Sequence, residues 1–254
     1  MNPADKARLQ YDGLLDSGQR LEFLNRGSAE FGGKVWTPDE AAAALAPFLS
    51  EERATRIASV VASRTRHLSV VVEGLVNTGN ISAVMRTAEA LGLLDFHIVG
   101  ATDATYKISE RTTVGAEKWL DVHVWDAVAP AAESLRERGY RIAATCLDEH
   151  AVPLADVDFS EPTALVFGNE LEGISTEMAG AADLHVYIPM RGFAQSLNIS
   201  TAAAVTLHHA LGRVPEECAK LSQDEQEALS ADYALRSIRE AEAILARLAE
   251  DQRE

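Results

Sequence analysis

From residue 68 onward, short apolar runs alternate with helical patterns, and this alternation leaves few folds open to the chain. The runs are rich in β-branched residues and nearly continuous, which is typical of strands in a parallel sheet that helices cover on both faces. They fall at residues 68–72, 96–99, 122–125, 141–145, 164–167 and 185–188, and the helical patterns lie near 80–92, 127–138, 175–181 and 199–211. The sequence therefore predicts an α/β domain of about 145 residues.

Helical extensions flank this predicted domain. Thr37, followed by proline and by Glu40, forms a capping box that starts a helix over 38–47, and Ser50 starts another over 51–65. Residues before 37 have weaker periodicity and predict a loosely helical arm. Ser222 opens a second capping box and one terminal helix, whose single apolar stripe continues to Leu248. The predicted segments are an N-terminal arm and helical extension at 1–66, the α/β domain at 67–213 and a C-terminal helical extension at 214–254.

The chain is strongly acidic, with 23 Lys and Arg against 39 Asp and Glu among 254 residues and a formal net charge of −16. Phosphate binding needs clustered Lys and Arg, so this balance by itself argues against a nucleic-acid partner. The acidic excess is concentrated in residues 121–190 and 216–254, whereas residues 51–120 are neutral in sum. The charge therefore permits either an ordinary mixed surface or a basic face within 51–120.

Several classes of protein are excluded by composition. No apolar run approaches the ~20 residues that span a bilayer, and the first residues lack the apolar stretch of a secretory signal. Cys146 and Cys218 are too few for a disulfide framework or a zinc site, which favours a reducing compartment. We expect a cytoplasmic protein with no membrane partner and no metal.

Glycines follow two of the predicted strands, which invites comparison with nucleotide-binding motifs. Residues 74–80 lack the spacing of a dinucleotide fingerprint, and residues 168–175 lack the lysine that a phosphate-binding loop requires. The chain also has no Gly-x-Ser-x-Gly elbow and no His-Glu-x-x-His pair, which excludes the commonest hydrolase classes.

Three segments nevertheless place glycines and polar residues at strand ends, where α/β domains bind ligands. They read NTGNISAVMRT at 77–87, LVFGNELEGIS at 165–175 and IPMRGFAQSLNIS at 188–200. Each also has a plain structural explanation. The first fits a helix that Asn80 caps and from which Arg86 projects into solvent, the second a turn, and the third an elaborate N-cap.

In this order, the three segments resemble the signature motifs of the SpoU, or TrmH-type, RNA ribose 2′-O-methyltransferases of the SPOUT class. The matching letters are NISAxxRT, FGNExxGIS and IPMxGxxQSLNxS, and GAEKWLDV at 115–122 also looks like the family's segment after the second strand. The resemblance covers about residues 66–212. It implies a SPOUT-type α/β fold with a deep C-terminal trefoil knot, a rare exception to the rule against threaded chains.

The resemblance also implies a cofactor and a partner. The cofactor is S-adenosylmethionine, bound in a bent form by the knot loops, and the partner is a second copy in an obligate homodimer whose active site uses both subunits. Carried over by motif, the cofactor-binding residues are Thr145, Gly168, Asn169, Gly173, Ile188, Met190 and Leu197.

The motifs also carry over the family's catalytic positions, which are Asn80, Arg86, Glu170, Ser196 and Asn198. The implied reaction is an in-line attack of a ribose 2′-oxygen on the sulfonium methyl group, so the protein must align the reactants and remove a proton. In the family this arginine is usually proposed as the base, but a guanidinium has a pKa above ~12. We therefore expect Arg86 to clamp the target phosphate, with Ser196 and Asn198 orienting it. Glu170 is expected to hold its loop or the substrate ribose.

The RNA substrate stays open at this stage. Ribosomal RNA enzymes of the class often carry a larger N-terminal domain built on a sheet, whereas residues 1–66 show two helices. The extensions look more like the transfer-RNA enzymes that methylate a D-loop guanosine. A ribosomal RNA target, including antibiotic-resistance-type methylation, is the alternative, and a catalytically silent RNA-binding or cofactor-binding homologue is a third interpretation that the intact catalytic positions disfavour.

An RNA substrate requires a basic surface despite the net charge. We expect the RNA-binding residues to be Arg53, Arg64, Arg66, Arg111, Lys118 and Arg191. A dimer doubles such a patch, and RNA affinity that depends on it falls steeply with salt.

Overall fold

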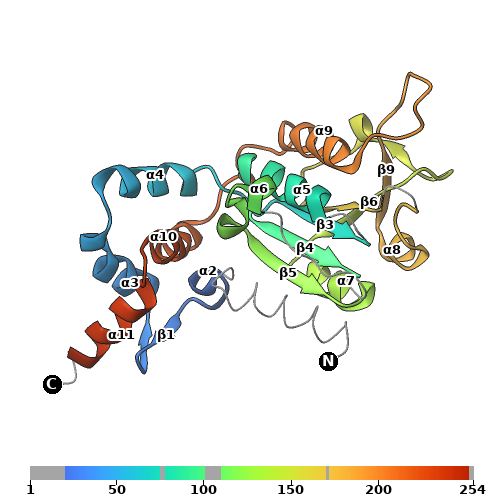
Figure 1. Ribbon diagram of the computed structural model, residues 1–254. Helices are drawn as coiled ribbons and strands as arrows, with labels where there is room; N and C mark the ends of the chain where they lie inside the picture. Colours follow the sequence, from blue (N-terminus) through green and yellow to red (C-terminus); the bar gives the residue numbers. More distant parts are fainter. Residues whose placement is uncertain (1–20, 75–77, 101–109, 170–171, 252–254) are drawn as a thin grey trace. The chain divides into compact units, whose positions relative to one another are not determined.

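The protein is described here by a computed structural model, which covers residues 21–74, 78–100, 110–169 and 172–251. Within these residues the chain forms two compact units (Figure 1). The first unit takes in residues 65–219, and the second combines residues 21–64 with 220–251. The N-terminal and C-terminal helical extensions, which were predicted as separate segments, thus belong to one unit.

The first unit is an α/β sheet domain. Its elements, in chain order, are β3 (Leu68–Glu73), α5 (Thr78–Ala90), β4 (Asp95–Val99), α6 (Glu110–Thr113), η3 (Ala116–Trp119), β5 (Asp121–Trp125), α7 (Val128–Glu137), β6 (Arg141–Thr145), β7 (Val152–Pro153), η4 (Leu154–Asp156), β8 (Thr163–Phe167), α8 (Thr176–Ala181), β9 (Leu184–Tyr187) and α9 (Ile199–Leu211). Six of the seven strands coincide with predicted runs. Strand β7 was not predicted, because its two residues are too few to form a recognisable pattern.

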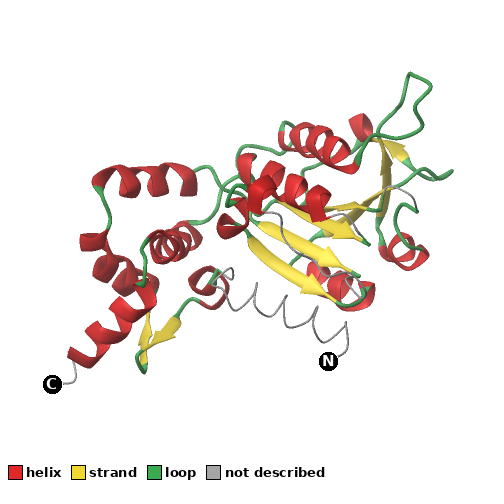
Figure 2. Ribbon diagram, viewed as in Figure 1, coloured by secondary structure: helices red, strands yellow, loops and turns green. Residues whose placement is uncertain are grey.

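All seven strands are parallel, in the order β5-β4-β3-β8-β6-β9-β7. Figure 2 shows the strands in yellow with helices on both sides of the sheet. Along β3, Val70 and Val72 pack with α5 and α9, whereas Val71 between them packs with α7 and α8. Both faces of the strand must therefore be apolar, which explains the continuous runs in the sequence. The predicted parallel sheet with helices on both faces is confirmed.

The second unit is mainly helical and contains one hairpin. Its elements are α2 (Glu22–Arg26), β1 (Ala29–Phe31), β2 (Lys34–Trp36), α3 (Pro38–Leu45), η2 (Ala46–Phe48), α4 (Glu51–Val61), α10 (Gln223–Ser237) and α11 (Ala241–Asp251). Its core joins both parts of the chain, since Phe23, Trp36 and Leu45 cluster with Leu245. Both predicted capping boxes are present, at Thr37 and Ser222, and the side chain of Ser50 caps α4 as expected.

Two predictions for this unit were wrong. The single terminal helix is two helices, because Ile238 is extended and Glu240 has a φ of 59°. The break lets α10 and α11 each direct apolar residues into the same core. The segment 29–36 is a hairpin and not part of a helical arm. Gly32 and Gly33, with φ angles of 62° and 72°, form its two-residue turn, and this Gly-Gly pair between short apolar runs is the signal that could have revealed it.

No helix within the described residues is long and apolar enough to cross a membrane.

Candidate active site

A cavity of about 250 Å³ lies at the carboxyl ends of β6, β8 and β9, close to the smaller sizes typical of small-molecule sites. Parallel strands bring these ends to one edge of the sheet, so the loops that follow them meet there. The lining residues are Thr145, Cys146, Leu147, Phe167, Gly168, Asn169, Gly173, Val186, Tyr187, Ile188, Met190, Gln195, Ser196, Leu197, Ile199, Ala202 and Thr206. All seven residues predicted to bind the cofactor are among them.

The segment after β8 is shaped by its glycines. The N–H of Asn169 donates to the carbonyl of Gly173, and the N–H of Gly173 donates back to the carbonyl of Asn169, each at 2.8 Å. A Cβ on Gly168 would lie only 2.2 Å from the carbonyl carbon of Gly173, so no side chain fits there. Gly173 itself has a φ of 72°, which favours glycine. The glycines thus let the backbone itself form part of the cavity wall.

Two polar contacts of Asp148 hold the segment after β6 beside the cavity. Asp148 accepts a hydrogen bond from the Cys146 thiol at 3.5 Å, and its carboxylate contacts Nδ1 of His185 on β9. Burial and the neighbouring Asp148 raise the pKa of the Cys146 thiol to about 11. Cys146, Asp148 and His185 offer donor atoms that lie within 4.8 Å of one another, and they already contact one another through Asp148. We therefore interpret the contacts among Cys146, Asp148 and His185 as structural.

The five predicted catalytic residues are placed differently by the structure. Ser196 lines the cavity, and Asn198 is the N-cap of α9, where its side-chain oxygen accepts from the Ser200 N–H at 3.0 Å. Asn80 lies in the first turn of α5, which begins at Thr78, so its predicted role as the helix cap was wrong. Glu170 lies outside the described residues.

Arg86 projects from α5 with its side chain exposed to solvent. In the described part of the chain its guanidinium makes no hydrogen bond or ion pair, so neither Ser196 nor Asn198 orients it within one chain. An arginine that is held by no protein carboxylate can bind a phosphate without first breaking an ion pair.

Two of the predicted RNA-binding arginines contact other side chains of the protein. Arg64 is only 1% exposed, and its guanidinium carbon lies 5.7 Å from the centre of the Tyr233 ring. Arg66 forms a bidentate ion pair with Asp95, at 3.0 and 3.2 Å, and contacts Asp121 at 3.4 Å. The prediction that Arg64 contacts RNA was wrong, and Arg66, whose side chain is 24% exposed, is already paired with two carboxylates. Sequence position does not reveal which arginines bind partners within the protein.

The other predicted RNA-binding residues differ from these two. Arg53 on α4, Lys118 on η3 and Arg191 in the loop after β9 are exposed. Arg111 belongs to α6, but its side chain is not described.

The carboxylates that bind Arg66 belong to a buried network at the amino edge of the sheet, away from the cavity. Asp95 and Asp121, the first residues of β4 and β5, are both 0% exposed. Arg138 donates to Asp95 at 2.8 Å, and the Tyr140 hydroxyl lies 3.1 Å from the same carboxylate. Burial lowers the pKa of Arg66, but the charges of Asp95 and Asp121 outweigh it and hold that pKa above its ordinary value.

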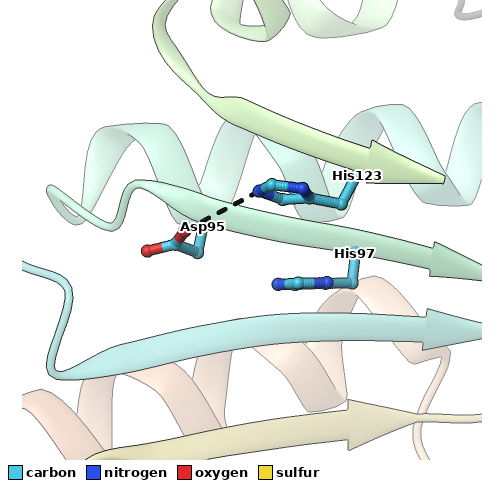
Figure 3. Close-up of side chains that lie close together, drawn as sticks. All are labelled: Asp95, His97 and His123. Carbon is cyan, nitrogen blue, oxygen red and sulfur yellow. Dashed lines mark ion pairs between the residues drawn. The ribbon is translucent and has the colours of Figure 1, made fainter. Parts of the chain in front are cut away.

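Figure 3 shows Asp95 with two histidines, His97 on β4 and His123 on β5. Their possible ligand atoms lie within 4.8 Å of one another, but the two imidazole rings are stacked, with centroids 4.7 Å apart and an angle of 17° between their planes. Stacked rings direct their in-plane lone pairs side by side and not toward one point. Asp95 is also occupied by two guanidiniums, so this group is typical of an ion-pair network and not of a metal centre.

His97 makes the stability of this network depend on pH. Burial lowers the pKa of His97 to about 3, and its Nδ1 accepts a hydrogen bond from the Trp125 indole at 3.0 Å. Below pH 6.5 His97 becomes protonated in the unfolded chain, whereas it stays neutral in the folded protein down to about pH 3. We therefore expect His97 to reduce the free energy of unfolding by up to about 1.4 kcal/mol per pH unit as the pH falls from 6.5 toward 3.

Urea denaturation of the wild type and of His97→Gln at pH 7, 6 and 5 measures this contribution. The variant should lose stability less steeply than the wild type as the pH falls. His150→Gln is the matched control, because the His150 side chain is 81% exposed, and it should follow the wild-type slope. Equal slopes for His97→Gln and the wild type would contradict the prediction.

Comparisons with known proteins agree on one family. The model of the SpoU rRNA Methylase family matches residues 67–208, more than half of the chain. A tRNA (guanosine(18)-2'-O)-methyltransferase of Borreliella burgdorferi is 36% identical over 170 residues, which are 67% of this chain and 78% of that protein.

Solved structures agree with these sequence matches. The A. aeolicus TrmH/SpoU tRNA modifying enzyme has a TM-score of 0.68 at 34% identity, covering 74% of this chain and 98% of that one. The SpoU methyltransferase AviRb from Streptomyces viridochromogenes, in complex with the cofactor AdoMet, has a TM-score of 0.52 at 30% identity, covering 60% and 62% of the two chains. The family match takes in all three motifs and nearly the whole sheet domain, and the chain therefore belongs to the SpoU rRNA Methylase family.

Proposed function

We propose that this protein transfers the methyl group of S-adenosylmethionine to the ribose 2′-hydroxyl of a guanosine in the D-loop of transfer RNA. The family membership and the names of the relatives support the reaction and the class of substrate. The observation that carries the proposal is the cavity at the carboxyl edge of the sheet, which residues of the second and third motifs line.

The chemistry of the cavity suits S-adenosylmethionine. Apolar side chains such as Phe167, Val186 and Ile188 offer contacts to the flat adenine, and the close turn at Gly168 exposes backbone groups to polar atoms of the ligand. When bound, this cofactor supplies a methyl group already activated by a sulfonium charge. The residues of the chain then have to hold the ligand, exclude water and orient the ribose.

Gly168 offers a direct test of cofactor binding. In Gly168→Ala the new methyl group would overlap the backbone of Gly173, so the turn that lines the cavity must open. We expect the affinity for S-adenosylmethionine to fall at least about tenfold, which corresponds to about 1.4 kcal/mol, as measured by isothermal titration calorimetry. Gly180→Ala is the control, because nothing lies within 4 Å of a Cβ there, and it should bind as the wild type does. Unchanged affinity in Gly168→Ala would remove this turn from the cofactor site.

Arg86 is the residue we assign to the substrate. Its exposed guanidinium presents paired N–H donors that match a phosphate, and binding the phosphate next to the target ribose fixes the 2′-hydroxyl and favours loss of its proton. Ser196 at the cavity and Asn198 at the start of α9 belong to the same proposed site, together with Asn80 and Glu170.

Tritiated-methyl transfer to size-fractionated total RNA, followed by nuclease mapping, tests the function. We expect label in the transfer-RNA fraction, on a guanosine whose 3′-phosphodiester resists alkaline hydrolysis because its 2′-oxygen is methylated. Label in ribosomal RNA would support the alternative substrate, after which the SpoU rRNA Methylase family is named. Calorimetric binding of S-adenosylmethionine with no RNA labelled would indicate a catalytically silent homologue.

We further propose that the active enzyme is a homodimer. Phe193 in the loop after β9 is fully exposed, and Val205 on α9 is 44% exposed, so two large apolar side chains near the proposed site face water. A second subunit would cover them and supply contacts that Arg86 lacks within one chain. Sedimentation equilibrium at micromolar concentration should give twice the 27.4 kDa of the chain, and a monomer with full activity would overturn the proposal.

Two finer features are also proposals. The deep C-terminal trefoil knot is supported by the family membership, and a crystal structure traced continuously from β6 through α9 tests it. The cytoplasmic location is supported by a transfer-RNA substrate and by two free cysteines, and cell fractionation tests it.

We propose that RNA contacts the basic residues Arg53, Arg111, Lys118 and Arg191. Charge reversal at each should weaken RNA binding at low salt.

A further inference from the structure

Glu73 is a buried carboxylate that lies outside the cavity and outside the three motifs. It is the last residue of β3 and is only 5% exposed. Its Oε2 accepts the N–H of Ser175 at 2.9 Å, and its Oε1 accepts the Ser175 hydroxyl at 2.5 Å. The Ser175 oxygen in turn accepts the N–H of Met178 at 3.0 Å, as the N-cap of α8. A continuous chain of hydrogen bonds thus joins the end of β3 to the start of α8.

A second hydrogen bond joins the same two regions. The side-chain amide of Asn169 donates to the carbonyl of Gly74 at 2.9 Å. Strands β3 and β8 are neighbours, with Val72 opposite Phe167, so the carboxyl ends of the two strands lie side by side. These hydrogen bonds therefore fix Asn169 and Ser175 to Gly74 and Glu73 at the end of β3.

The use of a carboxylate here needs an explanation. Burying a charge is costly unless it is paired or fully hydrogen-bonded, and within the described residues no Lys, Arg or His forms an ion pair with Glu73. Two hydrogen bonds from a single residue, Ser175, stabilise the charge instead. A carboxylate with two acceptor oxygens can hold both the N–H and the O–H of Ser175, which fixes that residue in position and orientation.

We propose that Glu73 is a positioning residue for methyl transfer. Through Ser175 it holds Gly173, which lines the cofactor cavity with Gly168 and Asn169, beside the end of β3, the strand that precedes α5 and Arg86 in the chain. The proposal rests on the proposed function. Because Glu73 does not line the cavity itself, it acts by aligning the cofactor side of the site with the substrate side.

The hydrogen bonds between Glu73 and Ser175 predict different single-turnover rates for three variants. Glu73→Ala and Ser175→Ala each break them, and we expect the single-turnover rate at saturating S-adenosylmethionine and RNA to fall at least about tenfold, since an error of 1 Å in alignment can cost about a hundredfold. In Glu73→Gln the amide oxygen can still accept the Ser175 N–H, and the NH₂ group can donate to the Ser175 oxygen. This variant should restore the rate to within about threefold of the wild type.

Val71→Ala separates positioning from stability. Val71 is buried on the same strand but packs toward α7 and α8, so its truncation should lower the melting temperature without changing the rate. All rates are measured well below the lowest melting temperature. The double variant Glu73→Ala with Ser175→Ala should be no slower than the slower single variant, because the two residues act through one contact.

The outcomes distinguish this inference from the proposed function. If the wild type labels RNA but Glu73→Ala and Ser175→Ala keep its rate, Glu73 is not a positioning residue and the function stands. A rate loss in Val71→Ala equal to that in Glu73→Ala would also overturn the inference, because it would reflect stability alone. If the wild type labels no RNA, the proposed function fails, and the binding of S-adenosylmethionine by Ser175→Ala then tests the positioning role of Glu73. Unchanged affinity relative to the wild type would overturn it, and a several-fold loss would support it.

Discussion

Replacing Arg86 with alanine is expected to lower the single-turnover rate of methyl transfer by at least about a hundredfold, with S-adenosylmethionine affinity unchanged. The physical reason is that Arg86 is exposed and does not line the cofactor cavity, so its loss should affect the RNA phosphate and the reacting hydroxyl alone. Rapid-quench measurement of labelled RNA gives the rate, and calorimetry gives the cofactor affinity.

Arg86→Lys separates the two possible roles of this side chain. A lysine retains the positive charge but loses the paired donors, so a phosphate clamp should become weaker, with reduced RNA affinity and a partly retained rate at saturating RNA. A base role predicts a rate with a different pH dependence, since the pKa of a lysine ammonium is lower than that of a guanidinium. Wild-type rate and affinity in Arg86→Lys would exclude both roles. Arg56→Ala, an exposed arginine on α4 outside the proposed site, is the control.

Replacing Asp95 with asparagine should destabilise the sheet domain by about 3 kcal/mol. Breaking a buried ion pair by removing one partner typically costs about 3–5 kcal/mol, and the side chains of Arg66 and Arg138 retain 24% and 29% exposure, which moderates the loss. Both guanidiniums would lose the carboxylate that they share. Burial, and after it the charge of Asp95, raises the pKa of the Tyr140 phenol well above its ordinary value.

Urea denaturation at pH 7 measures the loss for Asp95→Asn. Glu161→Gln is the matched control, because Glu161 is 71% exposed and lies 4.0 Å from Arg141, and exposed pairs contribute at most about 1 kcal/mol. A change below 1 kcal/mol for Asp95→Asn would mean that the network is solvated enough to tolerate the loss. If the variant does not fold, Asp121→Asn gives a milder test in the same direction, because Asp121 contacts Arg66 at 3.4 Å and His123 at 3.0 Å, whereas Asp95 pairs with both Arg66 and Arg138.

The sequence predicted the elements that depend on local pattern. Six strands, the helices that follow them and the caps at Thr37, Ser50 and Ser222 all occur as expected, because continuous burial on both faces and side-chain capping leave direct marks in the sequence. The hairpin at 29–36 and the break at Ile238 were missed. The first depends on a Gly-Gly turn between very short strands, and the second depends on a core that α10 and α11 share.

In the candidate site, too, local motifs were predicted and contacts between distant residues were not. The motifs placed seven residues at the proposed cofactor site, and all seven line one cavity. The arginines were predicted less well. Arg64 and Arg66 look like Arg53 in the sequence, yet Arg64 is buried beside Tyr233, and Arg66 is paired with Asp95 and Asp121. Glu73 escaped notice because its partner, Ser175, is 102 residues away along the chain.

By itself, then, the sequence determined the parallel sheet, the family and the positions of the three motifs, since these depend on the order and spacing of residues along the chain. Only the tertiary structure decided which charged side chains are available. An arginine, a glutamate or a histidine acquires its role from distant groups that surround it, and burial among such groups separates Arg64, Glu73 and His97 from residues of the same type on the surface.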